Sequence, residues 1–431
     1  MSIEELDTPV VLLANPGFVR DAQSAASNKG MPAIRTLPLN VACESTVPED
    51  INAGTSEAMP SIIDALTKPL TDHEKSPEWS TEPPPRIAFK GIYEDVNRFF
   101  YRKGWGDGLP IVPPTEEAVK EMMKGSDLPA DHVVAKVIPR QGKATIEKIA
   151  INAVMAGALP THMPVIIATL EVLADQKTRF DTFEVSTGSW APFLAINGPI
   201  RDQIHINYGS GALSPGDIAN AAIGRAVGLI VKNIGGARKG IEDMGVIGNP
   251  SKYTLVIGED EEKSPWEPLH VERGFRKEEN TLTVFFPNSY TQAVPQGTDA
   301  EGIAKAMLGM NPWSMSCFIV IPSHAKTLAS EGWTKKKLKE FLLYGSDSPI
   351  DSFLQREGEE ESKDILSQPP AAIDTDSLLI LVAGGPGAWT GLLKSVGGIK
   401  NDFVTKQIKL PRDWDTLVKK YKIVVPFYAM Y

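Results

Sequence analysis

The stretch FLAINGPIRDQIHINYGSGALSPGDIANAAIGRAVGLIVKN, residues 193–233, contains the clearest indication of the fold class. Its first five residues form a short apolar run that is typical of a buried strand, and a glycine-containing loop follows. Ser214, Pro215 and Asp217 then supply a cap, a first-turn proline and a first-turn acid, so a helix is predicted over 215–234. A strand, a loop and a helix in this order form the basic unit of an α/β protein.

Strands and helices continue to alternate on both sides of this stretch, which predicts an α/β fold with a mixed sheet for most of the chain. The predicted helices span 146–157, 164–174, 215–234, 300–309, 325–329 and 334–343, and the predicted strands span 193–197, 253–258, 281–286, 317–321, 378–383 and 422–427.

The N-terminal region resembles only half of an α/β layer. Two short strands, at 8–14 and 33–39, alternate with helices at 20–29 and 47–70. Parallel sheets normally contain more strands than this, so we expect a truncated N-terminal α/β half-domain with an open sheet edge that another chain or segment covers.

The chain is long enough for several units, and its composition suggests where they end. We expect a partial domain over 1–70, a proline-rich linker over 71–86 and a main domain over 87–345. A charged loop or linker over 346–372 and C-terminal strands over 373–431 that pack back on the main domain complete the prediction.

Composition excludes several classes of protein. The 431 residues carry a formal charge of −10, which argues against nucleic acid as a partner, and no apolar run reaches the length of a membrane span. Two cysteines that are far apart in sequence, Cys43 and Cys317, give neither a disulfide framework nor a zinc site. Together with the acidic, polar N-terminus, this predicts a cytoplasmic protein; Cys317 is expected in a strand core, and Cys43 is the better candidate for a reactive thiol.

The segment SPWEPLHVERGF, residues 264–275, concentrates titratable groups after the carboxyl end of a predicted strand, where α/β proteins place ligand crevices. His270 is predicted as the acid/base, Glu272 and Glu267 as orienting groups or bases, and Arg273 as an anion clamp. The alternative is that the preceding acids form a solvated run and pair with Arg273.

Other polar side chains stand on elements that are otherwise apolar, or beside glycines. A glycine-rich loop before a helix suits a phosphate or carboxylate, although a tight turn and a capped helix explain it equally well. Lys148 and Asn152, four residues apart, form either a pocket wall or a structural pair. The predicted substrate-binding residues are Asn152, Lys148, Asn197, Arg201, Asn207, Ser210, Asn220, Arg225, Arg238 and Arg273.

A metal site built from His270, His324 and nearby acids is a further alternative, but no spacing matches a known metal motif. The sequence therefore identifies neither a metal nor an organic cofactor.

Several stretches together resemble one family, the long UGSC-like (seleno)proteins, named for a Sec/Cys-Gly-Ser-Cys motif in a small domain. They are GWGDGLPIVPPTEEAV, ATIEKIAINAVMAGALP, INGPI, GALSPGDIANAAIGRA, NIGGAR and SPWEPLHVERGF. The resemblance covers about 87–345, and residues 8–70 resemble the part of the small domain that follows the motif. No CGSC occurs in this chain, so the resemblance implies that a reactive thiol or selenol would come from a separate small UGSC/CGSC-motif protein.

Three functions follow as hypotheses. The first is a cytoplasmic enzyme that acts on a small anionic molecule by reductive or lyase chemistry with a thiol- or selenol-bearing partner. The second is a hydratase or lyase that uses His270 and carboxylates, with or without a metal. The third is a non-catalytic binding subunit of a motif-bearing partner, and each hypothesis is compatible with a homo- or hetero-oligomer.

Overall fold

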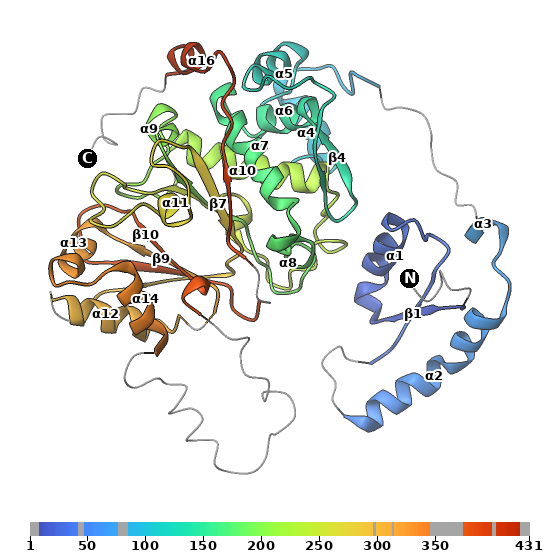
Figure 1. Ribbon diagram of the computed structural model, residues 1–431. Helices are drawn as coiled ribbons and strands as arrows, with labels where there is room; N and C mark the ends of the chain where they lie inside the picture. The colour runs from blue at the N-terminus through green and yellow to red at the C-terminus, as the bar shows by residue number, and fades with distance from the viewer. Residues whose placement is uncertain are drawn as a thin grey trace, which may run out of the picture.

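The computed structural model describes residues 8–41, 47–75, 85–295, 299–312, 314–344, 374–398 and 402–422. These residues form a small N-terminal unit and a large body (Figure 1). The body combines helices with mixed sheets, which confirms the predicted α/β class. Among the described residues, no helix is both long and apolar enough to cross a membrane.

The body contains two four-stranded sheets. The first has the order β6-β5-β7-β12 and the second the order β10-β9-β11-β8. Their strands are β5 (Phe193–Asn197), β6 (Val256–Gly258), β7 (Thr281–Phe285), β8 (Ser289–Ala293), β9 (Ser316–Val320), β10 (Leu378–Val382), β11 (Thr390–Lys394) and β12 (Val404–Gln407).

The two sheets pack face to face. Because alternate side chains of a strand point to opposite faces, Phe193 of β5, Phe285 of β7 and Cys317 of β9 meet in one apolar cluster between the sheets. The Phe285 ring lies 5.4 Å from the Phe193 ring and 5.3 Å from that of Phe403, centroid to centroid. This cluster is the inner layer of the core.

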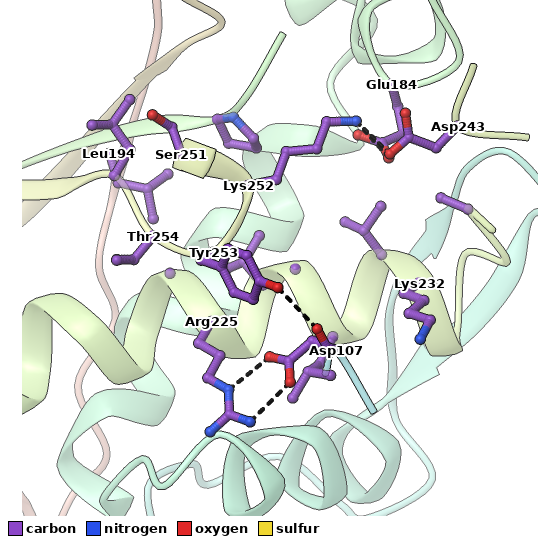
Figure 2. Close-up of a pocket in the computed structure, with 18 of the residues that line it drawn as sticks. Asp107, Glu184, Leu194, Arg225, Lys232, Asp243, Ser251, Lys252, Tyr253 and Thr254 are labelled. Carbon is purple, nitrogen blue, oxygen red and sulfur yellow. Dashed lines mark hydrogen bonds and ion pairs between the residues drawn. The ribbon is translucent and has the colours of Figure 1, made fainter. Parts of the chain in front are cut away.

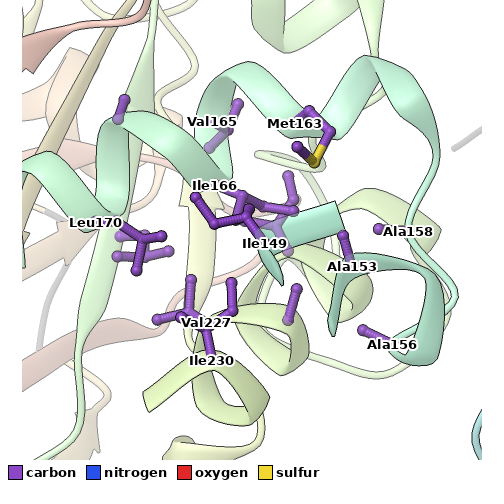
Figure 3. Close-up of a cluster of buried hydrophobic side chains, with 14 of the residues drawn as sticks. Ile149, Ala153, Ala156, Ala158, Met163, Val165, Ile166, Leu170, Val227 and Ile230 are labelled. Carbon is purple, nitrogen blue, oxygen red and sulfur yellow. The ribbon is translucent and has the colours of Figure 1, made fainter. Parts of the chain in front are cut away.

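Helices cover both outer faces, as Figure 1 shows. On the first sheet, α6 (Ile146–Met155), α7 (Met163–Leu173) and α10 (Ile218–Asn233) bury Ile149, Ile166 and Val227 together (Figure 3). On the second sheet, α12 (Ala300–Gly309), α13 (Pro322–Ser330) and α14 (Lys335–Tyr344) cover side chains such as Phe318 and Ile380. The body is therefore a sandwich of helices, sheet, sheet and helices.

The two sheets share one topology. In each, a parallel pair (β5 with β6, β9 with β10) is followed by two antiparallel neighbours. The pairing continues past the strands in the same way, because Glu259 N donates to Ile196 O and Ala383 N donates to Val320 O. However, β8 follows β7 in the chain but lies in the second sheet, and β12 follows β11 but lies in the first. Each half thus gives its last strand to the sheet of the other.

Smaller elements surround this framework. Thr115 caps α5, because its hydroxyl accepts from Ala118 N at 3.2 Å. The remaining elements of the body are α4 (Tyr93–Arg102), α5 (Glu116–Met123), the hairpin of β3 (Val133–Val137) and β4 (Gly142–Thr145), α8 (Phe180–Phe183), α9 (Ile200–Gln203), α11 (Leu269–Glu272) and α16 (Trp414–Lys420).

The N-terminal unit has a two-stranded parallel sheet, β1 (Val11–Ala14) and β2 (Arg35–Pro38). Helices α1 (Val19–Asn28), α2 (Pro48–Thr67) and α3 (Asp72–Lys75) accompany it. Residues 76–84 and 345–373, and with them most or all of the two predicted linkers, lie outside the described residues, as does Cys43.

Most predicted elements of the body are present with small shifts of their ends. The predicted helix 215–234 begins only at Ile218, because Gly216 has a φ of +143°, outside the helical region, and Asp217 is extended at the N-cap. The Asp217 carboxylate accepts from Asn207 Nδ2 and caps no helix N–H. Strands β3, β4, β8, β11 and β12 were not predicted, and the predicted strand 422–427 lies almost entirely beyond the described residues.

We predict that the body stays assembled when its chain is cut within 346–372, at an inserted protease site. The C-terminal piece contains β10, β11 and β12, which pair with strands of the first piece in both sheets. After cleavage the two pieces should elute together in native size-exclusion chromatography and separate only in concentrated guanidinium. Separate elution in native buffer would contradict the observed strand exchange.

Candidate functional site

A cavity of about 240 Å³ lies beside α10. The segment 250–255 forms one side, and the loops around residues 107 and 239 form others (Figure 2). Its lining residues are Asp107, Glu184, Pro192, Leu194, Gly224, Arg225, Val227, Gly228, Leu229, Val231, Lys232, Ala237, Lys239, Asp243, Ser251, Lys252, Tyr253, Thr254 and Leu255.

Two glycines of α10 bring the helix close to segment 250–255. A Cβ at Gly224 would collide with Thr254, and one at Gly228 would lie 2.8 Å from Lys252 O. Glycine costs a helix roughly 1 kcal/mol against alanine, and here the cost permits close backbone contact. The wall of the cavity therefore depends on these two positions.

One end of the cavity is an ion pair between Arg225 and Asp107. The guanidinium donates from Nε to Asp107 Oδ2 at 2.7 Å and from Nη2 to Oδ1 at 2.9 Å. Burial alone would raise the pKa of Asp107, but the bonds from Arg225 outweigh it and lower that pKa. Lys232 and Asn233 also donate to carbonyls of this loop, at Gly106 and Trp105, so α10 fixes the loop.

The opposite end contains a buried carboxyl group, Glu184, at the C-terminal end of α8. Lys252 Nζ lies 2.6 Å from Asp243 Oδ2 and 3.6 Å from Glu184 Oε1. Figure 2 shows the Lys252 side chain pointing toward the two carboxylates. Burial, aided by the charge of Asp243 and opposed by Lys252, raises the pKa of Glu184 to about 7. At neutral pH this carboxyl is therefore divided between its acidic and basic forms.

Between the two ends the wall is apolar, with Pro192, Leu194 and Val227 among its residues. Lys232 and Lys239 add positive charge at the side, and burial lowers the pKa of Lys232. The arrangement can hold a small molecule with an apolar body and an anionic group while Glu184 exchanges a proton with it.

Of the predicted substrate-binding residues, Arg225 lines this cavity. Asn152 lies behind it, where its Oδ1 accepts from Asn233 Nδ2 at 2.8 Å. Of the two alternatives for Lys148 and Asn152, the pocket wall does not fit this cavity, because Lys148 is exposed and the Asn152 side chain donates to the Lys148 carbonyl at 2.9 Å.

The predicted residues of the glycine-rich loop are held by the protein itself. Asn220 accepts from Asn207 N at 2.8 Å and donates to Val256 O at 2.9 Å. Asn207 Nδ2 donates to Asp217 Oδ2 at 2.8 Å, so a carboxylate already stands at the helix start, and Ser210 is exposed. These contacts fit the tight-turn alternative better than an anion site.

Two further predicted residues are buried in polar networks. The guanidinium of Arg201 lies 3.1 Å from Glu261 and 2.9 Å from Glu262. Asn197 Nδ2 donates to Glu259 Oε2 at 2.6 Å. They anchor the segment that follows β6. Arg238 pairs with Glu242 and lines a different cavity.

The segment 264–275 does not face the cavity beside α10. His270 is fully buried, and its Nε2 lies 3.2 Å from Lys277 O. Glu272 pairs with Lys339 at 2.5 Å, and Arg273 donates to Thr405 Oγ1 at 2.5 Å.

Glu272 and Arg273 line a second cavity of about 820 Å³, and Glu267 is exposed. The predicted acid/base His270 and the predicted substrate-binding residue Arg225 therefore do not share a cavity, and the charged groups of this segment pair with residues distant in sequence.

No metal site emerges within the described part of the chain, which contains no group of three or more His, Cys, Asp or Glu side chains placed to hold an ion. His324 lies 2.9 Å from Thr390 Oγ1, a contact separate from that of His270. Cys317 is buried in β9, as predicted, and burial raises the pKa of its thiol.

Glu184, Lys252 and Asp243 were missed by sequence reasoning. The available signal was weak: Glu184 stands between the apolar residues Phe183 and Val185, where a carboxylate needs a partner if it is buried.

No family model, curated protein or solved structure was found to match the chain. The function is therefore inferred from the geometry of the site.

We predict that Glu184→Gln changes the pH dependence of stability. The carboxyl binds its proton more tightly in the folded chain, where its pKa is about 7, than at its ordinary value of 4.5. The folded chain therefore loses stability as pH rises from about 4.5 to about 7, and glutamine escapes this loss.

Urea unfolding should show a variant close to wild type at the acidic end and up to about 3 kcal/mol more stable above pH 7. Asp181→Asn, at an exposed carboxylate of α8, is the matched control and should show no such trend. A difference between Glu184→Gln and wild type that is independent of pH would contradict the raised pKa.

Proposed function

We propose that this chain is an enzyme, of the hydratase or lyase type, that transfers a proton to or from a small anionic molecule bound beside α10. Glu184 is the acid/base, and the cations of the same cavity hold the anionic group. The observation that carries the proposal is a buried carboxyl with a pKa of about 7, set beside Lys252 and Asp243 at one end of a cavity whose middle is apolar.

The position of Glu184 suits proton transfer. A general acid or base works best when its pKa is near the working pH, and a carboxyl reaches that range only through burial or like charge. Both causes act here, because the group is buried and Asp243 stands nearby. Lys252, which contacts both carboxylates, stabilises the ionised form after the proton has left.

The apolar walls and the fixed loop support the same reaction class. Excluding water strengthens the interaction between Lys252, Glu184 and a bound anion. The Arg225–Asp107 pair fixes the far end, so substrate length is limited by the distance between the two charged ends. A small carboxylate with a short carbon body suits the 240 Å³ cavity.

A partner chain is part of the proposal. The N-terminal unit has a sheet of only two described strands, and Leu12 and Leu13 of β1 are 40% and 38% exposed. A sheet of this size gains stability from further cover, which a small UGSC/CGSC-motif protein or a second copy of the chain would supply. Reductive chemistry would take its thiol from such a partner or from Cys43, which lies outside the described residues, since Cys317 is buried in the core.

We also place the protein in the reducing cytoplasm, because it carries only two cysteines and the described one is a free thiol.

Proton transfer is tested by exchange with D₂O. The full chain is incubated with a panel of hydroxy-, oxo- and unsaturated carboxylates of short chain length, and deuterium uptake is measured by mass spectrometry. At least one member should gain deuterium faster than in the enzyme-free blank. Glu184→Gln should lower that rate about 100-fold or more, the usual contribution of a positioned acid/base.

Asp181→Asn again serves as the control and should keep the wild-type rate, because its side chain is 68% exposed. Equal exchange rates for Glu184→Gln and wild type would overturn the proposed role, and absence of exchange across the panel would overturn the proposed reaction class.

A further inference from the structure

A third cavity, of about 420 Å³, lies where the N-terminal unit meets the body. Helix α1 supplies one side, and the segments around Arg140 and Arg238 supply the other. The contact between the two units includes a hydrogen bond from Ser24 Oγ to Glu242 Oε1, 2.9 Å long. The lining residues are Arg20, Gln23, Ser24, Ser27, Arg140, Arg238 and Ile241.

Glu242 holds two of the three arginines in place. Its carboxylate is only 1% exposed and accepts from Nε and Nη2 of Arg140 at 2.9 and 2.5 Å. It also accepts from Nε and Nη2 of Arg238 at 2.9 and 2.6 Å. Burial alone would raise the pKa of Glu242, but the arginine bonds outweigh it and lower that pKa to about 2, so Glu242 stays ionised.

Donors remain for a ligand. Both arginines use the same edge, Nε and Nη2, for Glu242, and neither Nη1 group donates to an atom of the described residues. Arg20, on α1, has neither an ion pair nor a side-chain hydrogen bond within the described part of the chain. Three guanidinium groups thus line the cavity, and Glu242 pairs with two of them.

A second acid, Asp21 of α1, lies near Glu242. Asp21 is not among the lining residues, and burial together with the charge of Glu242 raises its pKa. Ser27 and Gln23 add neutral donors on the α1 side.

We propose that this junction binds the phosphate group of a small molecule, which links the N-terminal unit to the body. Several guanidinium groups around one point are the arrangement that recognises phosphate, because each offers paired N–H donors that match two phosphate oxygens. The cavity is larger than a phosphate ion, so it has room for the body of a phosphate ester beside Ile241.

The site is connected to the cavity beside α10 through a shared segment. Ala237, Lys239 and Asp243 line that cavity, whereas Arg238 and Ile241 line the junction. A phosphate at the junction therefore fixes the segment that carries Asp243, the partner of Lys252. The phosphate site stands on its own geometry and does not rest on the proposed proton transfer.

Isothermal titration of the full chain with inorganic phosphate and with glycerol 3-phosphate, at constant ionic strength, tests the proposal. At least one should bind with a Kd below about 1 mM. Tighter binding of the ester would identify a metabolite as the ligand, and equal binding would identify free phosphate. No heat of binding from either at about 10 mM would overturn the site.

Arg20→Gln should weaken binding about tenfold or more, because one charge-assisted contact is lost. Lys29→Gln, just beyond α1 and outside the lining, is the control and should bind as wild type does. Circular dichroism spectra that match wild type would show that Arg20→Gln is folded. Unchanged affinity in Arg20→Gln would overturn the part assigned to the N-terminal unit.

Hydrogen exchange gives an independent readout. Phosphate should slow amide exchange in Val19–Asn28 and in 237–243 together, since the ligand contacts both sides. Protection confined to the body would overturn the bridging role. That result would leave the proposed proton transfer untouched, because the latter is measured by deuterium uptake into the carboxylates and not into the backbone amides.

Discussion

The exchange of β8 and β12 between the two sheets is the constraint on which the rest of the structure depends. Phe285, between Phe193 and Phe403, packs strands from distant parts of the chain into the layer between the sheets. Because β12 closes one side of the first sheet and α6, α7 and α10 cover its outer face, β5 and β6 are fixed in position. The segment 250–255, which leads into β6, therefore lies against α10 at a fixed distance, and the cavity between them follows from that contact.

The groups of the candidate site come from four regions of the chain, and all but the local contact of Asp243 with Lys252 join residues far apart in sequence. Asp107 is held by Arg225, and Glu184 and Asp243 meet at Lys252. Such an arrangement makes the charge state of the site a property of the folded chain. Glu184 would titrate as an ordinary carboxyl in a peptide, and only the burial that the fold imposes raises its pKa to about 7.

How much the sequence predicts differs between the elements. Strong apolar runs predicted β5, β10, α6 and α7 within a few residues, because these elements are buried and their signals are local. The strand β8 was not predicted, since its exposed Tyr290 and polar Gln292 suggest a loop and only pairing with β11 makes them a strand. The same holds for the candidate site. The sequence predicted Arg225 as a binding residue, but it could not predict that Glu272 pairs with Lys335 and Lys339, because these lysines are distant in sequence.

The strand exchange also has a consequence for the order of events during synthesis. One edge of β7, Thr281–Phe285, remains unpaired until Val404–Gln407 has left the ribosome. The second sheet is also incomplete until β10 and β11 have been synthesised. Neither sheet can close while the chain is incomplete, so folding depends on contacts of high sequence separation and is expected to be slow. During that interval the nascent chain exposes an unpaired apolar strand, which is the kind of surface that chaperones bind and that other nascent chains join by mistake.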